Sequence, residues 1–231
     1  FLLSLSALSI YSVYKIGITD SLFYKFDSLG ALFSLILSIL NFATFYHSIL
    51  YFQRHDFSKK QEAAYYVALI MLNASMISAY YAENIALLWV SIEATTLFVS
   101  VLIFHERTKD ALEATWKYLF ISSVGVAIAF MGILFFSLLS TQSGFSELSI
   151  SKLMESAAKM DTLWLKIAFL LVLTGFSAKM GIFPLHTVTV DAHTVAPPPI
   201  SAFISTTLMN VGFLGIFRVF CIIDKTPVLQ W

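Results

Sequence analysis

Apolar runs about as long as a membrane is thick recur through the whole chain. A helix needs roughly 20 mostly apolar residues to cross the hydrocarbon core of a bilayer. Seven segments of this kind predict membrane-spanning helices, at residues 1–17, 28–52, 63–81, 85–104, 115–139, 163–183 and 200–222. We therefore expect an all-α fold, a polytopic transmembrane helix bundle of about seven spans that forms one domain over residues 1–231.

The composition agrees with a membrane protein and excludes several other classes. Hydrophobic residues make up 58% of the chain and charged residues 12%, against roughly 25% charged residues in soluble domains. A formal net charge of zero argues against nucleic acid as a partner. The single cysteine, Cys221, excludes an internal disulfide and a metal site built from cysteines. The expected surroundings are the lipid bilayer.

The loops between the apolar runs predict an orientation. One set of basic residues lies on one side of the bundle: Arg54, Lys59, Lys60, Arg107 and Lys109. A smaller set lies on the other side: Lys25, Lys152 and Lys159. Basic loops stay in the cytoplasm, so the first side is expected to be cytoplasmic in a multi-pass protein of the cell (inner) membrane. Residues 146–161 are less hydrophobic but keep a helical period, which predicts a short amphipathic helix on the membrane interface.

The stretch from residue 174 to residue 199 places a lysine next to a helix break. Lys179 has apolar or small neighbours, and Gly181 and Pro184 follow it directly. A lysine at membrane depth costs about 2.5–3.5 kcal/mol on insertion scales, so it needs a water-lined cavity or an anionic partner. Pro184 lacks an N–H and frees a backbone acceptor near Met180. A lysine beside a broken helix is typical of ion-translocating proteins, although a side chain that reaches to the headgroups fits the pattern equally well.

Glu93 is the second ionisable residue within an apolar span. It lies in the middle of the run 85–104, in the sequence WVSIEATTL. Burial disfavours both a carboxylate and an ammonium, whereas their proximity favours both, so a Glu93–Lys179 pair would have an adjustable affinity for a proton. The alternative is a structural salt bridge, or a carboxyl group kept protonated by a helix carbonyl. Intramembrane ionisable residues are functional by default, which favours the first hypothesis.

Further polar residues lie around the break and at the start of the span 115–139. His186, Asp191 and His193 do not have the spacing or the cysteine companions of a metal site, so no metal is expected. For His186 the pattern favours a cap on the broken helix, and for His193 a proton relay. Lys117 lies four residues after Glu113 and can pair with it across one helical turn.

Together these residues resemble the antiporter-like membrane subunits of respiratory complex I, energy-converting hydrogenases and multisubunit Na+/H+ antiporters. The segment KMGIFPLHTVTVDAHTVAPPPISA is similar to the family signature K-x-x-x-x-P-x-H…D-A-H-x-x-A-P-x-P-[VI]-S-A. The segments WVSIEATTL and EATWKYLFISSVGVAIAFMGI look closest to the hydrogenase-4 and formate hydrogenlyase branch. The resemblance implies the first half of an inverted-repeat fold, with residues 63–222 as the first repeat and the chain as a fragment of a longer subunit.

The resemblance also implies roles for single residues. Glu93 matches the essential glutamate of the family, and Lys179 matches the essential lysine on its broken helix. The sequence departs from the family at Asn210, where the next helix usually has a lysine, and at residues 188–190, which read Val-Thr-Val in place of Trp-Leu-Pro. Asn210 can hold a water chain but carries no charge, which puts lateral proton transfer in doubt.

The function expected from the resemblance is proton translocation, or sodium translocation, by a membrane subunit of a redox-driven complex. The chain would work beside other membrane subunits of that complex. No flavin, nucleotide, haem or iron–sulfur motif is present, so no cofactor is expected and any redox catalysis would lie in other chains. The alternatives are a subunit of a multisubunit Na+/H+ antiporter and a non-conducting membrane anchor, the second of which Asn210 favours.

Overall fold

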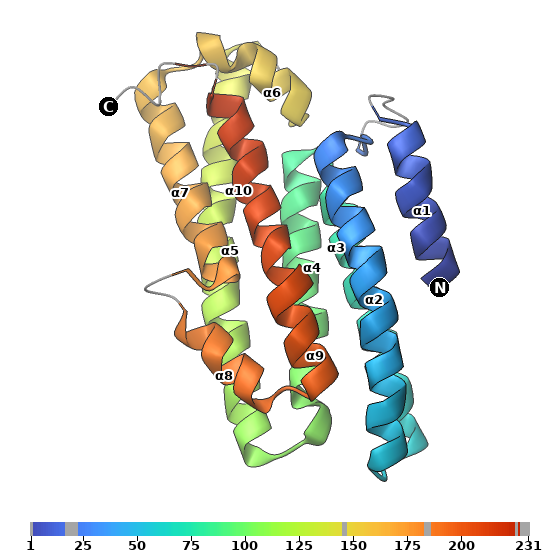
Figure 1. The fold of residues 1–231 in the computed structure, drawn as a ribbon. Coiled ribbons are helices and arrows are strands. Elements are labelled where there is room, and N and C mark those ends of the chain that lie inside the picture. Colours follow the sequence, from blue (N-terminus) through green and yellow to red (C-terminus); the bar gives the residue numbers. More distant parts are fainter. Residues whose placement is uncertain (1, 17–22, 145–146, 183–185, 225, 227–231) are drawn as a thin grey trace.

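The computed structural model shows a bundle of long helices that run side by side (Figure 1). It describes all residues except 1, 17–22, 145–146, 183–185, 225 and 227–231. The α-helices of the described residues are α1 (Leu2–Tyr14), α2 (Ser28–Arg54), α3 (Lys59–Tyr81), α4 (Ile85–Ile103), α5 (Lys109–Gln142), α6 (Ile150–Ser156), α7 (Thr162–Met180), α8 (Thr187–Val195), α9 (Pro198–Phe203) and α10 (Met209–Ile223). This arrangement confirms the all-α transmembrane bundle.

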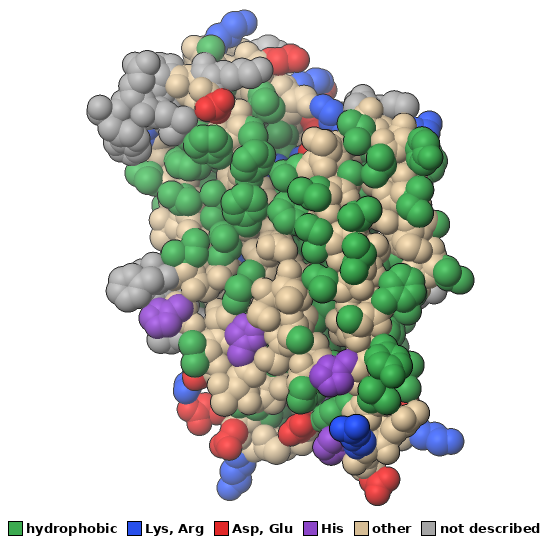
Figure 2. All heavy atoms as spheres, viewed as in Figure 1, with side chains coloured by type: hydrophobic (Ala, Val, Ile, Leu, Met, Phe, Trp, Pro, Cys, Tyr) green, Lys and Arg blue, Asp and Glu red, His purple; other side chains and the backbone are tan. Residues whose placement is uncertain are grey.

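Six helical segments of the described residues are long and apolar enough to cross a membrane. They are α2, α3, α4 with the 3-10 turn that follows it, α5, α7, and α9 with α10. The remaining expected segment contains α1, whose 13 described residues rise only about 20 Å at 1.5 Å per residue, so the expected count of about seven is approximate. Charged side chains gather at the two ends of the molecule, and hydrophobic side chains cover the band between them (Figure 2).

Two spans begin earlier than their apolar runs because polar caps start the helices. Ser58 and Gln61 form a capping box, so α3 starts at Lys59 and not at residue 63. The side chain of Thr108 accepts a hydrogen bond from the amide of Ala111, so α5 starts at Lys109 and not at residue 115. The charged residues at these starts belong to the helices and not to the loops.

The broken helix is present as two separate helices. Helix α7 ends at Met180, and α8 begins at Thr187. Gly181 ends α7 in the left-handed conformation, with φ of 68°. A β-carbon at Gly181 would lie 2.2 Å from the hydroxyl of Thr189, so glycine is required both for the turn and for the approach of α8. Pro184, the other expected break residue, lies outside the described residues.

Helices α5 and α7 approach each other closely through small residues. A β-carbon at Gly125 would lie 2.5 Å from the β-carbon of Ala178, and one at Gly175 would lie 2.5 Å from the carbonyl oxygen of Gly125. Small residues at a helix crossing let the backbones pack tightly in a membrane, where packing drives association. This crossing fixes the end of α7, and therefore Lys179, against α5.

Glu83 connects the start of α6 to the short segment between α3 and α4. Its carboxylate accepts hydrogen bonds from the hydroxyl of Ser149 at 2.8 Å and from the amide of Ser151 at 2.9 Å. Its carbonyl accepts from the amide of Ile150, at the start of α6. The short helix α6, within the expected 146–161 segment, is thereby tied to the junction of α3 and α4 across that end of the bundle (Figure 1).

The α5–α7 crossing predicts that added bulk at Gly125 destabilises the bundle. We expect Gly125→Leu to lower the free energy of unfolding by about 1–3 kcal/mol, the usual effect of overpacking. The matched control is Ala127→Leu, because Ala127 lies two residues away on the exposed face of α5. Unfolding of the purified protein in detergent measures both variants. Equal losses in the two would contradict the close crossing.

Glu83 predicts an acid-sensitive contribution to stability. Burial alone raises the pKa of this carboxyl group, but the hydrogen bonds from Ser151 and Ser149 and the charge of Lys25 outweigh it, so the pKa lies below its usual 4.5. The charged form therefore stabilises the fold above pH 4.5, and this contribution is lost as the pH falls through the lowered pKa.

We expect Glu83→Gln to weaken the fold at pH 7 by about 1.5–3 kcal/mol, the range for hydrogen bonds to charged groups. The variant should also lose part of the acid sensitivity of the wild type. The measurement is the unfolding temperature between pH 7 and pH 3. Glu147→Gln is the control, because Glu147 pairs with Lys152 in a half-exposed position at the same end. A wild-type acid dependence kept in full by Glu83→Gln would argue against this role.

Candidate functional site

Lys179 is buried at the point where α7 ends. Its side chain is 6% exposed and lies in the last turn of the helix. The ammonium donates hydrogen bonds to the hydroxyl of Thr96 on α4, at 2.7 Å, and to the hydroxyl of Tyr118 on α5, at 2.9 Å. The free carbonyl groups of a helix end also favour a positive charge there. The lysine is therefore held inside the bundle and does not reach to the headgroups.

Glu93 lies in the middle of α4, one turn before Thr96. One oxygen of its carboxyl group, Oε1, accepts a hydrogen bond from the hydroxyl of Ser123 on α5 at 2.9 Å. The other oxygen, Oε2, is buried without a hydrogen-bond partner among the described residues. Burying a carboxyl oxygen without a hydrogen-bond partner costs free energy. Oε2 of Glu93 is therefore an unfavourable feature that packing alone does not explain.

The expected direct pair of Glu93 and Lys179 is not formed. Within the described ranges, the ion pairs shorter than 4 Å involve other residues. A carboxylate at Glu93 and an ammonium at Lys179 would attract each other through space without direct contact. Residues of α4 and α5 surround the two ionisable groups. Thr96 of α4 and Tyr118 of α5 contact Lys179, and Ser123 of α5 contacts Glu93 of α4. The hydroxyl groups of Thr96, Tyr118 and Ser123 form a hydroxyl shell that contacts the two ionisable residues.

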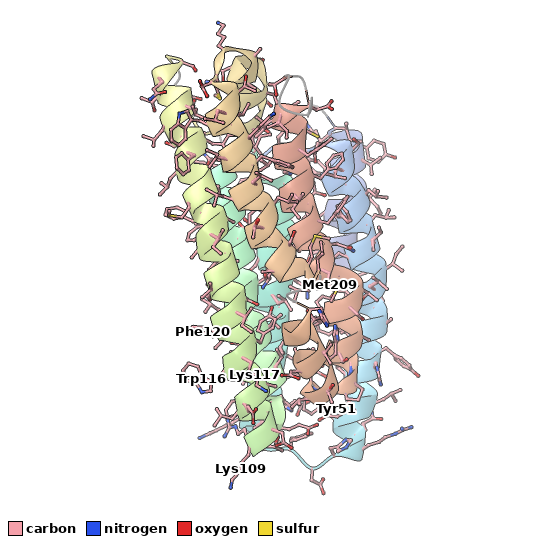
Figure 3. The ribbon with its side chains drawn as sticks, turned by 90° about the vertical axis from the view of Figure 1, so that its left-hand side faces the viewer. Tyr51, Lys109, Trp116, Lys117, Phe120 and Met209 are labelled. Carbon is pink, nitrogen blue, oxygen red and sulfur yellow. The ribbon has the colours of Figure 1, made fainter. Side chains whose placement is uncertain are left out.

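A surface ion cluster joins the second half of the broken helix to α5. Lys117 pairs with Glu113 at 2.8 Å, as the four-residue spacing predicts, and also with Asp191 of α8 at 3.2 Å. All three side chains are about half exposed. Figure 3 shows Lys117 on α5 beside Trp116 and Phe120, which point outward and are 65% and 72% exposed. Asp191 therefore fixes α8 to α5 and does not touch Lys179.

The two histidines of the break have different surroundings. The Nδ1 atom of His193 lies 3.2 Å from the hydroxyl of Ser201, which donates a hydrogen bond to the carbonyl oxygen of His193. This pairing connects α8 to α9 across the proline turn. His186 is exposed at the N-terminus of α8, and its carbonyl oxygen accepts from the amides of Thr189 and Val190. The cap at His186 is formed by its backbone and not by its side chain.

Asn210 lies directly after a π-helical turn. This turn, Ile204–Leu208, interrupts the α-helix between α9 and α10. The amide of Asn210 donates to the carbonyl oxygen of Thr206 at 2.9 Å. The side chain of Asn210 is therefore bound to the backbone of the π-helical turn.

Sequence reasoning missed the hydroxyl groups that surround the two ionisable residues. Thr96 could have been found from its place one turn after Glu93, whereas nothing in the sequence alone connects Tyr118 or Ser123 to them. It also missed Arg218, which is buried and pairs with Asp27 at 3.1 Å near the Glu83 end. In the described part of the chain, no three His, Cys, Asp or Glu residues come together as a metal site would require.

Comparisons with known proteins agree with this arrangement. The chain is 32% identical over 212 residues to a hydrogenase-4 component F homolog of Methylacidiphilum infernorum, covering 89% of this chain and 44% of that protein. It is 28% identical over 200 residues to NADH-quinone oxidoreductase subunit N of a Geobacillus species, covering 85% of this chain and 40% of that protein. The chain thus spans less than half the length of these relatives.

Solved structures show the same fold. A chain of an archaeal membrane-bound sulfane sulfur reductase superposes with a TM-score of 0.80 at 17% identity, covering 93% of this chain and 45% of that one. Residues 82–230 match the family described as the transmembrane domain of NADH:quinone oxidoreductase and Mrp antiporter. This matched segment contains Glu93, Lys179 and the broken helix, and the protein lies in the cell membrane with several spans. The chain therefore belongs to the NADH:quinone oxidoreductase/Mrp antiporter transmembrane family.

Proposed function

We propose that the chain moves protons through Glu93 and Lys179 as part of a membrane subunit in a redox-driven complex. The observation that carries this proposal is the way in which Lys179 is held. Its nitrogen lies against two hydroxyl groups, and no carboxylate of the described residues pairs with it. A hydroxyl group can accept a hydrogen bond from an ammonium and can donate one to a neutral amine. The same two partners therefore suit Lys179 with and without its proton.

Glu93 supplies the charge that would bias this exchange. Its attraction for the ammonium acts through space, so a small movement of α4 relative to α7 changes the interaction without breaking a contact. In the mechanism, a charge change in a neighbouring subunit shifts Glu93 relative to Lys179. The lysine then releases its proton when the attraction weakens and takes up another when it is restored.

The relatives support a redox-driven parent complex. Their names are those of a hydrogenase component and of a quinone oxidoreductase subunit. Because the chain covers under half of each, the partners, the redox chemistry and the moving ion of the complete subunit belong to the proposal. Other chains of such a complex would carry the redox centres.

Two other functions are possible outcomes of a proton-uptake experiment on the parent complex. A subunit of a multisubunit Na+/H+ antiporter would show sodium-dependent transport without redox turnover. A non-conducting anchor is favoured by Asn210, because its amide donates to a backbone carbonyl group and cannot take up a proton or carry a charge.

The test is proton uptake during turnover by proteoliposomes that contain the intact parent complex. We expect Lys179→Ala to lose proton uptake per turnover, because alanine removes the exchanging group. Lys166→Ala is the matched control, since Lys166 lies on the same helix 13 residues earlier. Unchanged uptake in Lys179→Ala would assign this chain to a structural anchor.

The hydroxyl partners give a finer prediction. We expect Thr96→Val to slow proton uptake at least about fivefold, because a buried group that loses one hydrogen-bond partner is destabilised by roughly 1–3 kcal/mol. Thr95→Val is the control, since the hydroxyl of Thr95 is bonded to the carbonyl oxygen of Ile92 within its own helix. The same uptake assay compares them. If both variants pump like the wild type, the hydroxyl shell has no part in proton exchange.

A further inference from the structure

The turn between α4 and α5 contains an arginine in an uncommon conformation. Arg107 follows the short 3-10 helix Phe104–Glu106 with φ of 53°, the one positive φ of a non-glycine residue in the described part of the chain. This left-handed conformation is ordinarily taken by glycine, and other residues adopt it at a conformational cost. Among the described residues, the guanidinium of Arg107 takes part in no ion pair. An exposed arginine therefore occupies a position where glycine would be the ordinary residue.

Arg107 lines a cavity between the start of α3 and the end of α4. The cavity has a volume of about 380 Å³, and its other lining residues are Gln61, Ala64, Tyr65, Val101, Phe104 and His105. It lies where the span Ile85–Glu106 ends, at the end of the bundle that carries the basic loops. Charged side chains gather at this end of the molecule (Figure 2). The end of a membrane span lies at the level of the lipid headgroups, and so does this cavity.

One side of the cavity presents hydrogen-bond donors. The guanidinium of Arg107 can bind a phosphate group through two parallel N–H groups. The side-chain oxygen of Gln61 accepts from Ser58, so the amide N–H groups of Gln61 remain as donors. The neighbouring carboxylate of Glu106 is not part of the lining and accepts from the hydroxyl of Tyr51 at 2.8 Å. The donors therefore favour an anion as the occupant.

Aromatic side chains hold one wall of the cavity in place. The ring of His105 lies 4.8 Å from the ring of Phe57, 5.2 Å from that of Tyr65 and 5.4 Å from that of Phe52, measured between centroids. Phe52 belongs to α2 and Tyr65 to α3, so this cluster fixes the end of α4 against both helices. The cavity is therefore formed by packing within the chain and does not need a ligand to create it.

The other side of the cavity is apolar and continues onto the outer surface of α4. Val101, in the lining, is 48% exposed, and Leu97, one turn earlier on the same helix, is 54% exposed. In a membrane span such outward apolar side chains contact lipid acyl chains. A free phosphate ion has no group to place against them, whereas a phospholipid has a glycerol backbone and two acyl chains.

We propose that this cavity binds one anionic phospholipid, with Arg107 and the amide of Gln61 on its phosphodiester group and Val101 beside its acyl chains. Basic pockets between membrane helices suit such headgroups. A zwitterionic phospholipid carries its own cation, which Arg107 and the basic loops around it repel. The bound lipid links the start of α3 to the end of α4. This site is separate from Lys179 and does not depend on proton translocation.

The test is the unfolding temperature of the purified full-length subunit in neutral detergent, with dioleoylphosphatidylglycerol or dioleoylphosphatidylcholine at equal concentration. A ligand that binds only the folded state raises this temperature. We expect phosphatidylglycerol to raise the wild-type value by at least about 3 °C more than phosphatidylcholine does. Arg107→Gln should lose most of this difference. Arg54→Gln should keep it, because Arg54 is an exposed arginine at the same end but outside the cavity lining. Equal effects of the two lipids on the wild type, or a full difference in Arg107→Gln, would overturn the proposal.

A second variant separates lipid binding from folding. Glycine adopts the left-handed conformation without a steric cost, so Arg107→Gly should unfold no lower than the wild type when no lipid is added. It should nevertheless lose the phosphatidylglycerol effect, because the guanidinium is absent. If Arg107→Gly keeps this effect, Arg107 does not hold the lipid and the proposal fails. Sodium phosphate should raise the wild-type unfolding temperature no more than sodium chloride does. A rise equal to that with phosphatidylglycerol would assign the cavity to free phosphate and contradict a lipid site.

Discussion

The burial of the Lys179 ammonium is the constraint on which the site depends. Moving such a charge from water into a protein interior costs several kcal/mol even after relaxation. Two hydroxyl groups at 2.7 Å and 2.9 Å, the carbonyl end of α7 and the distant charge of Glu93 offset this cost. A direct carboxylate would hold the proton permanently. Hydroxyl groups suit the nitrogen in either protonation state, which is the property that the proposed proton exchange requires.

The packing of α7 brings the lysine to these partners. Gly175 lies one turn before Lys179 and lets α5 approach, and Gly181 lies two residues after it and ends the helix. The Lys117–Asp191 pair then fixes α8 on α5 from outside. Small residues and surface charges therefore determine where one buried charge lies.

The sequence was sufficient for the class of fold, and it singles out Glu93 and Lys179 as the candidate site residues whose role is proposed above. Apolar runs predict helices of the right type, and Glu93 and Lys179 are conspicuous because they are charged within such runs. Helix starts at Lys59 and Lys109 were misplaced, because capping residues lie in charged segments that read as loops. Thr96, Tyr118 and Ser123 could not be assigned, since a hydroxyl group in an apolar helix is common and only tertiary packing shows which one meets a charge. The sequence likewise does not show whether Glu93 and Lys179 touch, because this also depends on tertiary packing.

The most direct test of this account is a double-mutant cycle on proton uptake per turnover, with Glu93→Asp, Lys179→Arg and the two combined. Both substitutions keep the charge and move it, so partial activity remains measurable. If the two groups act together through space, the combined effect should differ from the product of the single effects by more than about fivefold, the size of an interaction energy near 1 kcal/mol. Single effects that simply multiply would show that Glu93 and Lys179 act independently, and would contradict the mechanism.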